Sequence, residues 1–323
     1  MANIAIVNYC NLKCPYCFAD NMIHEKIKTI SIEDYCKILE FLSRTPKNYV
    51  GIIGGEPTLH PQFSEILKET NKYCKEVDTG ATIFTNGINI EPFLPQIGDR
   101  IGLLINCNSP QFQSEELFNK QRQSLDHLDE LSWFDKKASC GCNIHPGLDD
   151  YSYIWDIVDR YHLDHLRTSV VSPAACYEKY RSDKEGYYNI MKPKFLQYCK
   201  DAIKHHCIVT LDCGHIPLCY FTSEEKEILA EAMNGQINYP ELCKPVVDIT
   251  ADFKATACFG AYDPIDIRDF DDLDQLETYL FVKKTLPRIE ANCTGKCTSC
   301  RKYELLQCQG GCLGFAYPNK GDN

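Results

Sequence analysis

The chain has 323 residues, of which 44% are hydrophobic, 24% are charged and 20 are cysteines, and its formal net charge is −11 at pH 7. This acidic balance argues against a nucleic-acid substrate, because phosphate binding requires a basic surface. No apolar run approaches the roughly 18 residues of a membrane span. The first expected strand starts at Asn3, which leaves no room for a signal peptide. We therefore expect a cytoplasmic protein with no membrane partner, whose cysteines serve metal chemistry rather than disulfides.

Strand-like and helix-like stretches alternate along the first two thirds of the chain. We expect strands near 3–8, 49–53, 81–84, 101–106, 137–144, 165–171 and 207–212, and helices near 31–44, 61–74, 89–96, 114–130, 151–161 and 187–206. Ser31, followed three residues later by Asp34, is a suitable N-cap for the first helix. The alternation predicts an α/β fold with a parallel sheet, and six βα units predict a partial (β/α)6 TIM-like barrel over residues 1–206.

Three cysteines lie within eight residues near the N-terminus. Cys10, Cys14 and Cys17 follow the pattern C-x3-C-x2-C. Three thiolates this close can hold three irons of a [4Fe-4S] cluster and leave the fourth iron open to a small molecule. Structural zinc sites usually take four ligands in two separated pairs, and the nearest further candidate is His24. Zinc and disulfides remain alternatives at this point, but the spacing favours an open cluster.

A second motif follows about forty residues later. The apolar run from Val50 ends in Gly54-Gly55-Glu56-Pro57. This predicts a buried strand whose carboxyl end exposes its backbone to a ligand, with Glu56 able to accept from an ammonium group. In a parallel barrel the functional groups gather at such strand ends, where Cys10–Cys17 and Thr85-Asn86-Gly87 are also expected.

Together the two motifs resemble the radical S-adenosylmethionine (SAM) superfamily over roughly residues 3–206. The resemblance implies that the three cysteines hold a [4Fe-4S] cluster whose open iron chelates SAM, and that the glycine-rich strand end binds the SAM amino group. It implies reductive cleavage of SAM to a 5′-deoxyadenosyl radical that abstracts a substrate hydrogen. The cofactor-binding residues expected on this basis are Tyr16 near the adenine, Gly54, Gly55, Glu56, Pro57, Asn86, and Asn106 and Asn108 near the ribose.

Several of these residues also have simpler explanations. Tyr16 would equally shield the cluster, and Asn106 or Asn108 would equally cap a loop. Cys142, at the end of the fifth expected strand, is a candidate hydrogen-atom donor to a substrate radical. Its alternative is a small buried residue, the commonest fate of a free cysteine.

The C-terminal part is rich in cysteine. Five thiols lie within twenty residues, at Cys293, Cys297, Cys300, Cys308 and Cys312. No hydrophobic core needs this density, and with one iron–sulfur cluster already inferred, further clusters are favoured over zinc. Residues 207–323 are therefore expected to form a small cysteine-rich α+β domain that holds one or two auxiliary [4Fe-4S] clusters.

This segment resembles the SPASM/twitch auxiliary-cluster domains. Cys243 and Cys258 match the first pair of that pattern, although Phe253 stands where its glycine is expected. Seven residues instead of five separate Cys300 from Cys308, and the last cysteine is missing. The resemblance implies a first cluster on Cys243, Cys258 and Cys312, completed by Cys219, Cys213 or an exogenous group. It implies a second on Cys297, Cys300 and Cys308, with Cys293 replacing the absent ligand; a single auxiliary cluster is an alternative.

Enzymes with such domains often modify peptides, so the expected function is a radical SAM maturase of the RiPP type that crosslinks, epimerises or oxidises a peptide. A flavodoxin- or ferredoxin-type reductant is the expected electron donor. Because no leader-recognition module precedes Asn3, we expect either a separate leader-binding protein or a small substrate. The alternatives are a small-molecule radical SAM dehydrogenase or isomerase, and a non-enzymatic zinc or electron-transfer protein.

Overall fold

The computed structural model describes residues 1–17, 28–172, 180, 182–214, 216–235, 246–259 and 263–316. The chain divides into two compact units that do not follow residue order. The first comprises Met1–Cys14, Ala19–Cys140 and Pro245–Leu280, and the second comprises Pro15–Phe18, Gly141–Lys244 and Phe281–Asn323. Each unit is described by itself.

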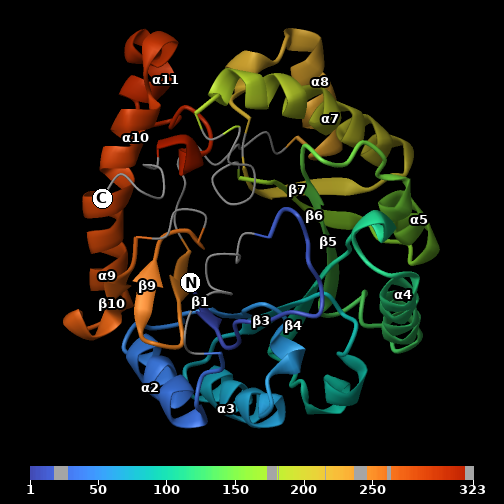
Figure 1. The fold of residues 1–323 in the computed structure, drawn as a ribbon, viewed down its shortest axis with the longest axis vertical. Helices are drawn as coiled ribbons and strands as arrows, with labels where there is room; N and C mark the ends of the chain where they lie inside the picture. Colours follow the sequence, from blue (N-terminus) through green and yellow to red (C-terminus); the bar gives the residue numbers. More distant parts are fainter. Residues whose placement is uncertain are drawn as a thin grey trace. The chain divides into compact units, whose positions relative to one another are not determined.

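The first unit is built on a mostly parallel sheet (Figure 1). Its strands are ordered β10-β9-β8-β1-β2-β3-β4. The parallel strands are β8 (Val247–Ile249), β1 (Ala2–Ala5), β2 (Val50–Ile53), β3 (Ala81–Thr85) and β4 (Ile101–Asn106). Strands β9 (Lys254–Thr256) and β10 (Ile265–Asp266) continue the sheet as an antiparallel edge.

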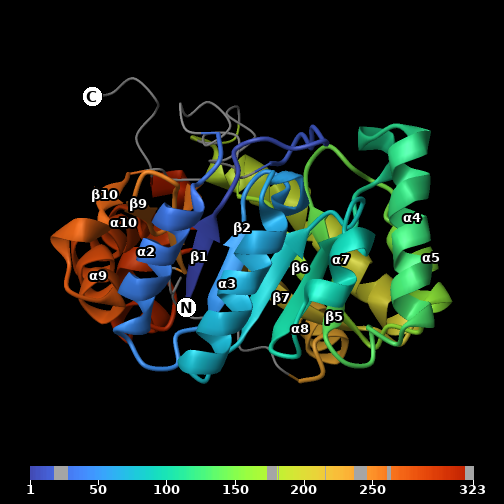
Figure 2. The same cartoon turned by 90° about the horizontal axis from the view of Figure 1, so that it is seen from below.

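Helices α2 (Ile32–Ser43) and α3 (Phe63–Glu76) cover one face of these strands, as Figure 2 shows. The side chains of Ile4, Ile52 and Ile83 lie in register on neighbouring strands and are fully buried. Their burial beneath the apolar faces of α2 and α3 removes the strands from water on that side, which is the main force holding a βα unit together. The remaining long helices of this unit are α4 (Glu115–Glu130) and α9 (Leu273–Leu280).

The described part of the second unit contains three parallel strands. Strand β5 (Ala138–Ile144) begins at the end of the first unit and runs into the second, where it pairs with β6 (His165–Val170), and β6 pairs with β7 (Ile208–Cys213). The described residues of this unit include helices α5 (Ser152–Arg160), α7 (Lys184–Lys204), α8 (Ser223–Ala232), α10 (Leu286–Asn292) and the single turn α11 (Arg301–Glu304). Short helices η5 (Leu218–Tyr220), η9 (Gly295–Ser299) and η10 (Leu313–Ala316) carry or flank the C-terminal cysteines.

The α/β class and the parallel pairing predicted from the alternating pattern are confirmed, and all seven expected strands are present with ends within three residues of those expected. Ser31 caps α2 as expected, accepting a hydrogen bond from the Asp34 amide at 3.0 Å. The expected helix near 89–96 is a 3-10 helix, η2 (Glu91–Gln96), and Pro95 inside it has no amide to donate to the i−4 carbonyl as an α-helix requires. The boundary at residues 206/207 between a barrel domain and a cysteine-rich auxiliary domain stays a prediction. No helix among the described residues combines the length and apolarity needed to cross a bilayer.

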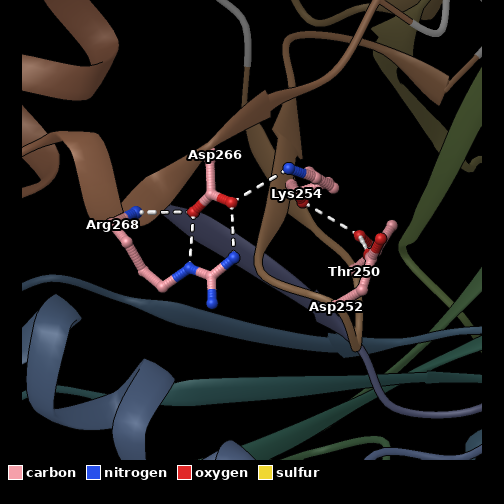
Figure 3. A network of polar contacts seen from close by, with 5 residues as sticks. All are labelled: Thr250, Asp252, Lys254, Asp266 and Arg268. Carbon is pink, nitrogen blue, oxygen red and sulfur yellow. Dashed lines mark hydrogen bonds and ion pairs between the residues drawn. The ribbon is translucent and has the colours of Figure 1, made fainter.

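The antiparallel edge of the first unit is fastened by one carboxylate. Asp266 accepts hydrogen bonds from the Lys254 Nζ at 2.9 Å and from the Arg268 Nε and Nη2 at 2.8 and 2.6 Å (Figure 3). The hydrogen bonds from Arg268 hold the pKa of this carboxyl well below its usual range. Beside it, the Thr250 hydroxyl donates to Asp252, which closes the β8–β9 turn. The short edge strands therefore have a side-chain clamp in addition to their few ladder bonds.

The opposite face of the sheet contains a buried acid. Asp248 on β8 is in register with Asn3 on β1, and the Asn3 Nδ2 donates to its Oδ1 at 2.8 Å. Gly51, the next residue in this row, makes room for the Asn3 amide, because a Cβ at Gly51 would overlap the Asn3 Oδ1. Burial raises the pKa of Asp248 to about 7, although hydrogen bonds from Asn3 and the Phe259 backbone oppose the shift. The folded protein therefore retains a proton there that the unfolded chain releases near pH 4.

We predict that the Asp248→Asn variant gains stability relative to the parent as the pH rises. A raised folded-state pKa stabilises the fold at low pH, and that stabilisation is lost as the pH rises toward about 7. The amide cannot ionise, so between pH 5.5 and 8 the variant should gain about 2 kcal/mol over the parent. Urea unfolding at both pH values measures this difference. If the exposed control Asp99→Asn gained the same stability over the parent between these pH values, the effect could not be assigned to the ionisation of Asp248.

Candidate active site

Backbone hydrogen bonds join the two motifs singled out in the sequence. The Gly55 amide donates to the Val7 carbonyl at 2.8 Å, and the Glu56 amide donates to the Tyr9 carbonyl at 3.0 Å. A Cβ at Gly55 would overlap the Tyr9 carbonyl, so only glycine allows this close approach. The segment that enters the Cys10 loop is therefore fixed against the carboxyl end of β2.

The buried Glu56 carboxylate accepts hydrogen bonds from residues at the ends of β2 and β3. The residue is 1% exposed, and its Oε1 accepts from the Thr58 hydroxyl at 2.7 Å and the Thr85 hydroxyl at 2.6 Å. Its Oε2 accepts from the Asn86 amide at 2.8 Å. Burial raises the pKa of Glu56, while the hydrogen bonds from Asn86, Thr85 and Thr58 oppose that shift. The side chain expected to receive an ammonium group is thus bound to internal donors, and it links the end of β2 to the end of β3.

Asn86 connects this network to the cysteine loop. Its Nδ2 donates to the Asn11 Oδ1 at 2.8 Å and lies 4.0 Å from the Cys10 Sγ. The Leu12 amide also donates to the Cys10 Sγ, at 3.3 Å. N–H donors directed at a cysteine sulfur stabilise a thiolate and are typical of iron–sulfur ligands. The surroundings of Cys10 therefore suit a thiolate ligand.

Cys14 meets the end of β4. Its thiol donates to the Asn108 Oδ1 at 3.7 Å, and the Asn108 Nδ2 lies 3.4 Å from the Asn106 carbonyl. From α4, the Gln121 Nε2 donates to the carbonyls of both Asn86 and Asn106, at 2.5 and 3.1 Å. The Asn106 Oδ1 is buried and has no hydrogen-bond partner among the residues that the structure describes. A buried acceptor without a donor is costly, so this atom marks a position where a ligand hydroxyl would be stabilised.

Tyr16 and Cys17 belong to the second unit, in the segment Pro15–Phe18. The Tyr16 ring is 8% exposed, and its centroid lies 4.5 Å from that of His145, directly after β5. Burial and, to a smaller extent, nearby Lys194 lower the pKa of His145 to about 4, so the imidazole is neutral at physiological pH. Tyr16 therefore rests on a neutral aromatic surface.

Cys142 lies within a tyrosine cluster. It is fully buried, and its Sγ is 3.4 Å from the Tyr153 hydroxyl of α5. Tyr198 of α7 also contacts this thiol, and the Thr168 hydroxyl lies 3.3 Å from the Tyr198 hydroxyl. Because α5 and α7 supply these neighbours, Cys142 packs as a small core residue. Hydrogen-atom donation by Cys142 stays a prediction.

Five cysteines of the second unit gather in one region. Burial raises the pKa of Cys219, and electrostatic repulsion from Cys308, Cys297 and Cys300 raises it further. Burial, with the proximity of Cys297 and Cys308, raises the pKa of Cys293 to about 12. Pro217 beside η5 lies close to Gly311, which brings the Cys219 turn against the loop that follows Cys308. Cys219 thus joins the set expected for the second auxiliary cluster, although the sequence favoured it for the first.

The remaining C-terminal candidates lie elsewhere. The Cys312 amide donates to the Tyr188 hydroxyl at 2.8 Å, and its thiol donates to the Ser172 hydroxyl at 3.3 Å. The Gly314 amide donates to the Cys312 Sγ at 3.4 Å, as the Gly310 amide does to the Cys308 Sγ. Cys258 belongs to the first unit, and Cys243 lies outside the described residues.

Among the described residues, no three Cys, His, Asp or Glu side chains are already drawn together closely enough to hold a metal ion. The donor chemistry nevertheless fits iron–sulfur clusters better than isolated cations. Thiols dominate both cysteine-rich regions, and backbone amides two residues further along the chain donate to Cys10, Cys308 and Cys312.

Three residues of the N-terminal site were not among the predicted site residues. Thr85, Asn11 and Gln121 hold Glu56, Asn86 and the end of β4 in place. Of the three, only Thr85 could be linked to the site from the sequence, because it precedes Asn86 at a strand end. Asn11 and Gln121 are common residue types whose roles arise from partners far away in the chain.

The segment that enters the three-thiol loop is hydrogen-bonded to the glycine-rich end of a parallel strand, which is the arrangement that the two sequence motifs predicted. Residues 4–115 match the family model of the Radical SAM superfamily. This match covers the part of the chain that holds both sequence motifs and agrees with the resemblance that those motifs carry.

Curated relatives match the chain only in part. GTP 3′,8-cyclase of Clostridium acetobutylicum is 33% identical over 137 residues, which cover 39% of this chain and 41% of the relative. The antilisterial bacteriocin subtilosin biosynthesis protein AlbA of Bacillus subtilis is 34% identical over 86 residues, covering 27% of this chain and 18% of the relative. The chain thus spans less than half the length of these relatives.

Solved structures share the fold over nearly the whole chain. Streptococcus suis SuiB bound to S-adenosylmethionine superposes with a TM-score of 0.61 at 19% identity, covering 98% of this chain and 75% of that one. Native anSMEcpe with bound AdoMet and the Cp18Cys peptide superposes with a TM-score of 0.66 at 16% identity, covering 98% and 90%. These likenesses confirm the fold class.

We predict that the Glu56→Gln variant is destabilised by about 2 kcal/mol, because an amide nitrogen would face the donors that the carboxylate now accepts. Anaerobic urea unfolding of the parent and variant measures the free-energy difference. Glu76→Gln, at an exposed position on α3, is the matched control and should change stability little. A Glu56→Gln variant as stable as this control would contradict the role of Glu56 in joining the ends of β2 and β3.

Proposed function

We propose that this protein binds a [4Fe-4S] cluster through Cys10, Cys14 and Cys17, binds SAM at the open iron, and modifies a peptide by radical chemistry. The observation that carries the proposal is the pair of backbone hydrogen bonds between the segment entering the Cys10 loop and Gly55-Glu56. They hold a cluster-type motif beside a glycine-rich strand end. When bound, the cluster and SAM together supply reductive cleavage of SAM and a 5′-deoxyadenosyl radical that abstracts a substrate hydrogen.

The chain's own residues supply binding and orientation. Gly54, Gly55 and Pro57 present a backbone without bulky side chains to the SAM amino group, and Glu56 keeps that strand end rigid. The partnerless Asn106 Oδ1 supports a ribose contact. Asn86 and Asn108 contact Cys10 and Cys14, so in this proposal they orient the cluster ligands as well as SAM. Tyr16, backed by His145, is the proposed adenine neighbour.

We further propose a SPASM/twitch-like auxiliary region in the C-terminal part. Cys297, Cys300 and Cys308, with Cys219 or Cys293 as the fourth ligand, form the better supported set, because these thiols are near neighbours. The second set, with Cys312, Cys258 and Cys243, rests on the sequence pattern alone. One or two auxiliary clusters therefore remain within the proposal.

A peptide substrate is supported by the fold neighbours. SuiB has been solved bound to its precursor peptide SuiA, and anSMEcpe with peptides. A small-molecule substrate is the second candidate, because several sequence relatives are GTP 3′,8-cyclases. Incubation with GTP or with a peptide pool, followed by mass spectrometry of both, separates the candidates: consumption of GTP with unchanged peptides would overturn the peptide assignment.

We predict that replacing Cys10, Cys14 and Cys17 together with alanine abolishes 5′-deoxyadenosine formation from SAM in the reconstituted, dithionite-reduced protein. The C-terminal thiols are untouched, so the variant should lose about four irons per chain and retain the rest. Iron analysis and chromatography of the nucleoside products measure the two effects. The matched control replaces the buried cysteines Cys74, Cys140 and Cys199 with alanine and should keep both cleavage and iron. Continued cleavage without Cys10, Cys14 and Cys17 would refute the cluster assignment.

A further inference from the structure

The segment between Cys293 and Cys312 has a charge opposite to that of the whole chain. Lys296, Arg301 and Lys302 are exposed and are accompanied by one exposed carboxylate, Glu304, whereas the chain as a whole carries −11. No ion pair recorded among the described residues involves any of these three cations. Their charge is therefore available to a partner.

The same turn exposes apolar side chains. Leu305 and Leu306 are 55% and 53% exposed, more than any other large hydrophobic residue described. Leu306 has a φ of 52°, a conformation that costs energy for a branched side chain. Hydrogen bonds from the Leu305 amide to the Arg301 carbonyl and from the Leu306 amide to the Tyr303 carbonyl, at 3.0 and 2.9 Å, hold the turn. Two leucines presented on a fixed turn and flanked by cations resemble the centre and rim of a docking site.

This surface coincides with the thiol cluster of the second unit. The basic and apolar residues lie within the stretch bounded by Cys297 and Cys308 or directly beside it, and the turn carrying the exposed Cys219 meets the same cysteines. A partner seated on this turn would approach the proposed auxiliary cluster without crossing a protein core.

We infer that Lys296, Arg301, Lys302, Leu305 and Leu306, called here the basic turn, form the docking surface for a small acidic electron-carrier protein. The inference rests on the proposed function, since reductive SAM cleavage requires one electron per event from outside the chain. Charge complementarity favours an acidic carrier as the partner. Most of a chain of charge −11 would repel such a carrier, whereas the basic turn would attract it. The leucines supply the apolar contact that such complexes need at their centre.

The test reverses the three charges with Lys296→Glu, Arg301→Glu and Lys302→Glu in the reconstituted full chain. The probe is a small acidic flavodoxin, whose binding is measured by surface plasmon resonance at low and high salt. We expect at least about tenfold weaker binding by the variant, and parent binding that weakens as salt is raised. 5′-Deoxyadenosine formation should fall with reduced flavodoxin as donor and stay at the parent level with dithionite, which needs no docking site.

The matched control makes the same charge change on an exposed face of α3, with Lys68→Glu, Lys72→Glu and Lys75→Glu. Retained flavodoxin binding by this control supports the assignment. Equal loss in both variants would show a response to net charge alone and overturn it, as would unchanged binding after reversal of the basic turn. Preferential capture of anionic lipid vesicles or RNA over flavodoxin by the same cations would also overturn it.

A second variant keeps the test open if charge reversal disturbs folding. Leu305→Ser with Leu306→Ser retains all charges and should weaken flavodoxin binding while preserving dithionite-supported turnover. Binding is measured independently of turnover, so an inactive parent with intact flavodoxin binding would reject the proposed function and leave the docking surface standing. If the parent is active and both variants bind flavodoxin as tightly as the parent does, the docking surface is rejected and the proposed function stands.

Discussion

The site depends on one buried carboxylate. Glu56 is almost completely removed from water, and an ionised group in that position is tolerated only if donors surround it. The donors come from Thr58, Thr85 and Asn86, so the ends of β2 and β3 have to meet at this residue. Once they meet, the Asn86 side chain reaches Asn11 beside Cys10, and the main chain of Gly55 and Glu56 holds Val7 and Tyr9. Satisfying this one carboxylate thus positions the loop on which the proposed chemistry depends.

The strands were predictable because burial imposes a pattern on them. Ile4, Ile52 and Ile83 face the covering helices, whereas Asn3, Gly51 and Thr82 face the other way, and both rows are visible as alternation in the sequence. Local chemistry also predicted the Ser31 cap. The joining of β8 to β1 could not be predicted in this way. Its register depends on the Asp248–Asn3 hydrogen bond between residues 245 positions apart, and no local pattern encodes such a pairing.

At the site, the spacing of cysteines and glycines was informative, and the orientation of single side chains was less so. Cys142 illustrates the difference. It alternates with Cys140 and Ile144 on a buried row of β5, while Gly141 and Asn143 occupy the other face. That parity was present in the sequence and indicated packing against helices, whereas proximity to a strand end suggested chemistry. The helix contacts from Tyr153 and Tyr198 agree with the parity.

The C-terminal cysteines show why a spacing pattern alone assigns ligands poorly. Cys219 lies some eighty residues before Cys297, so a linear motif groups it with its nearer neighbours, yet folding brings it to Cys297, Cys300 and Cys308. The same holds for charge. The net charge of −11 describes the chain as a whole, whereas a partner protein responds to the local electrostatic potential of the surface that it contacts. Cations and exposed leucines cluster at a turn that borders these thiols, so the proposed docking surface follows from the local surface and not from the overall composition.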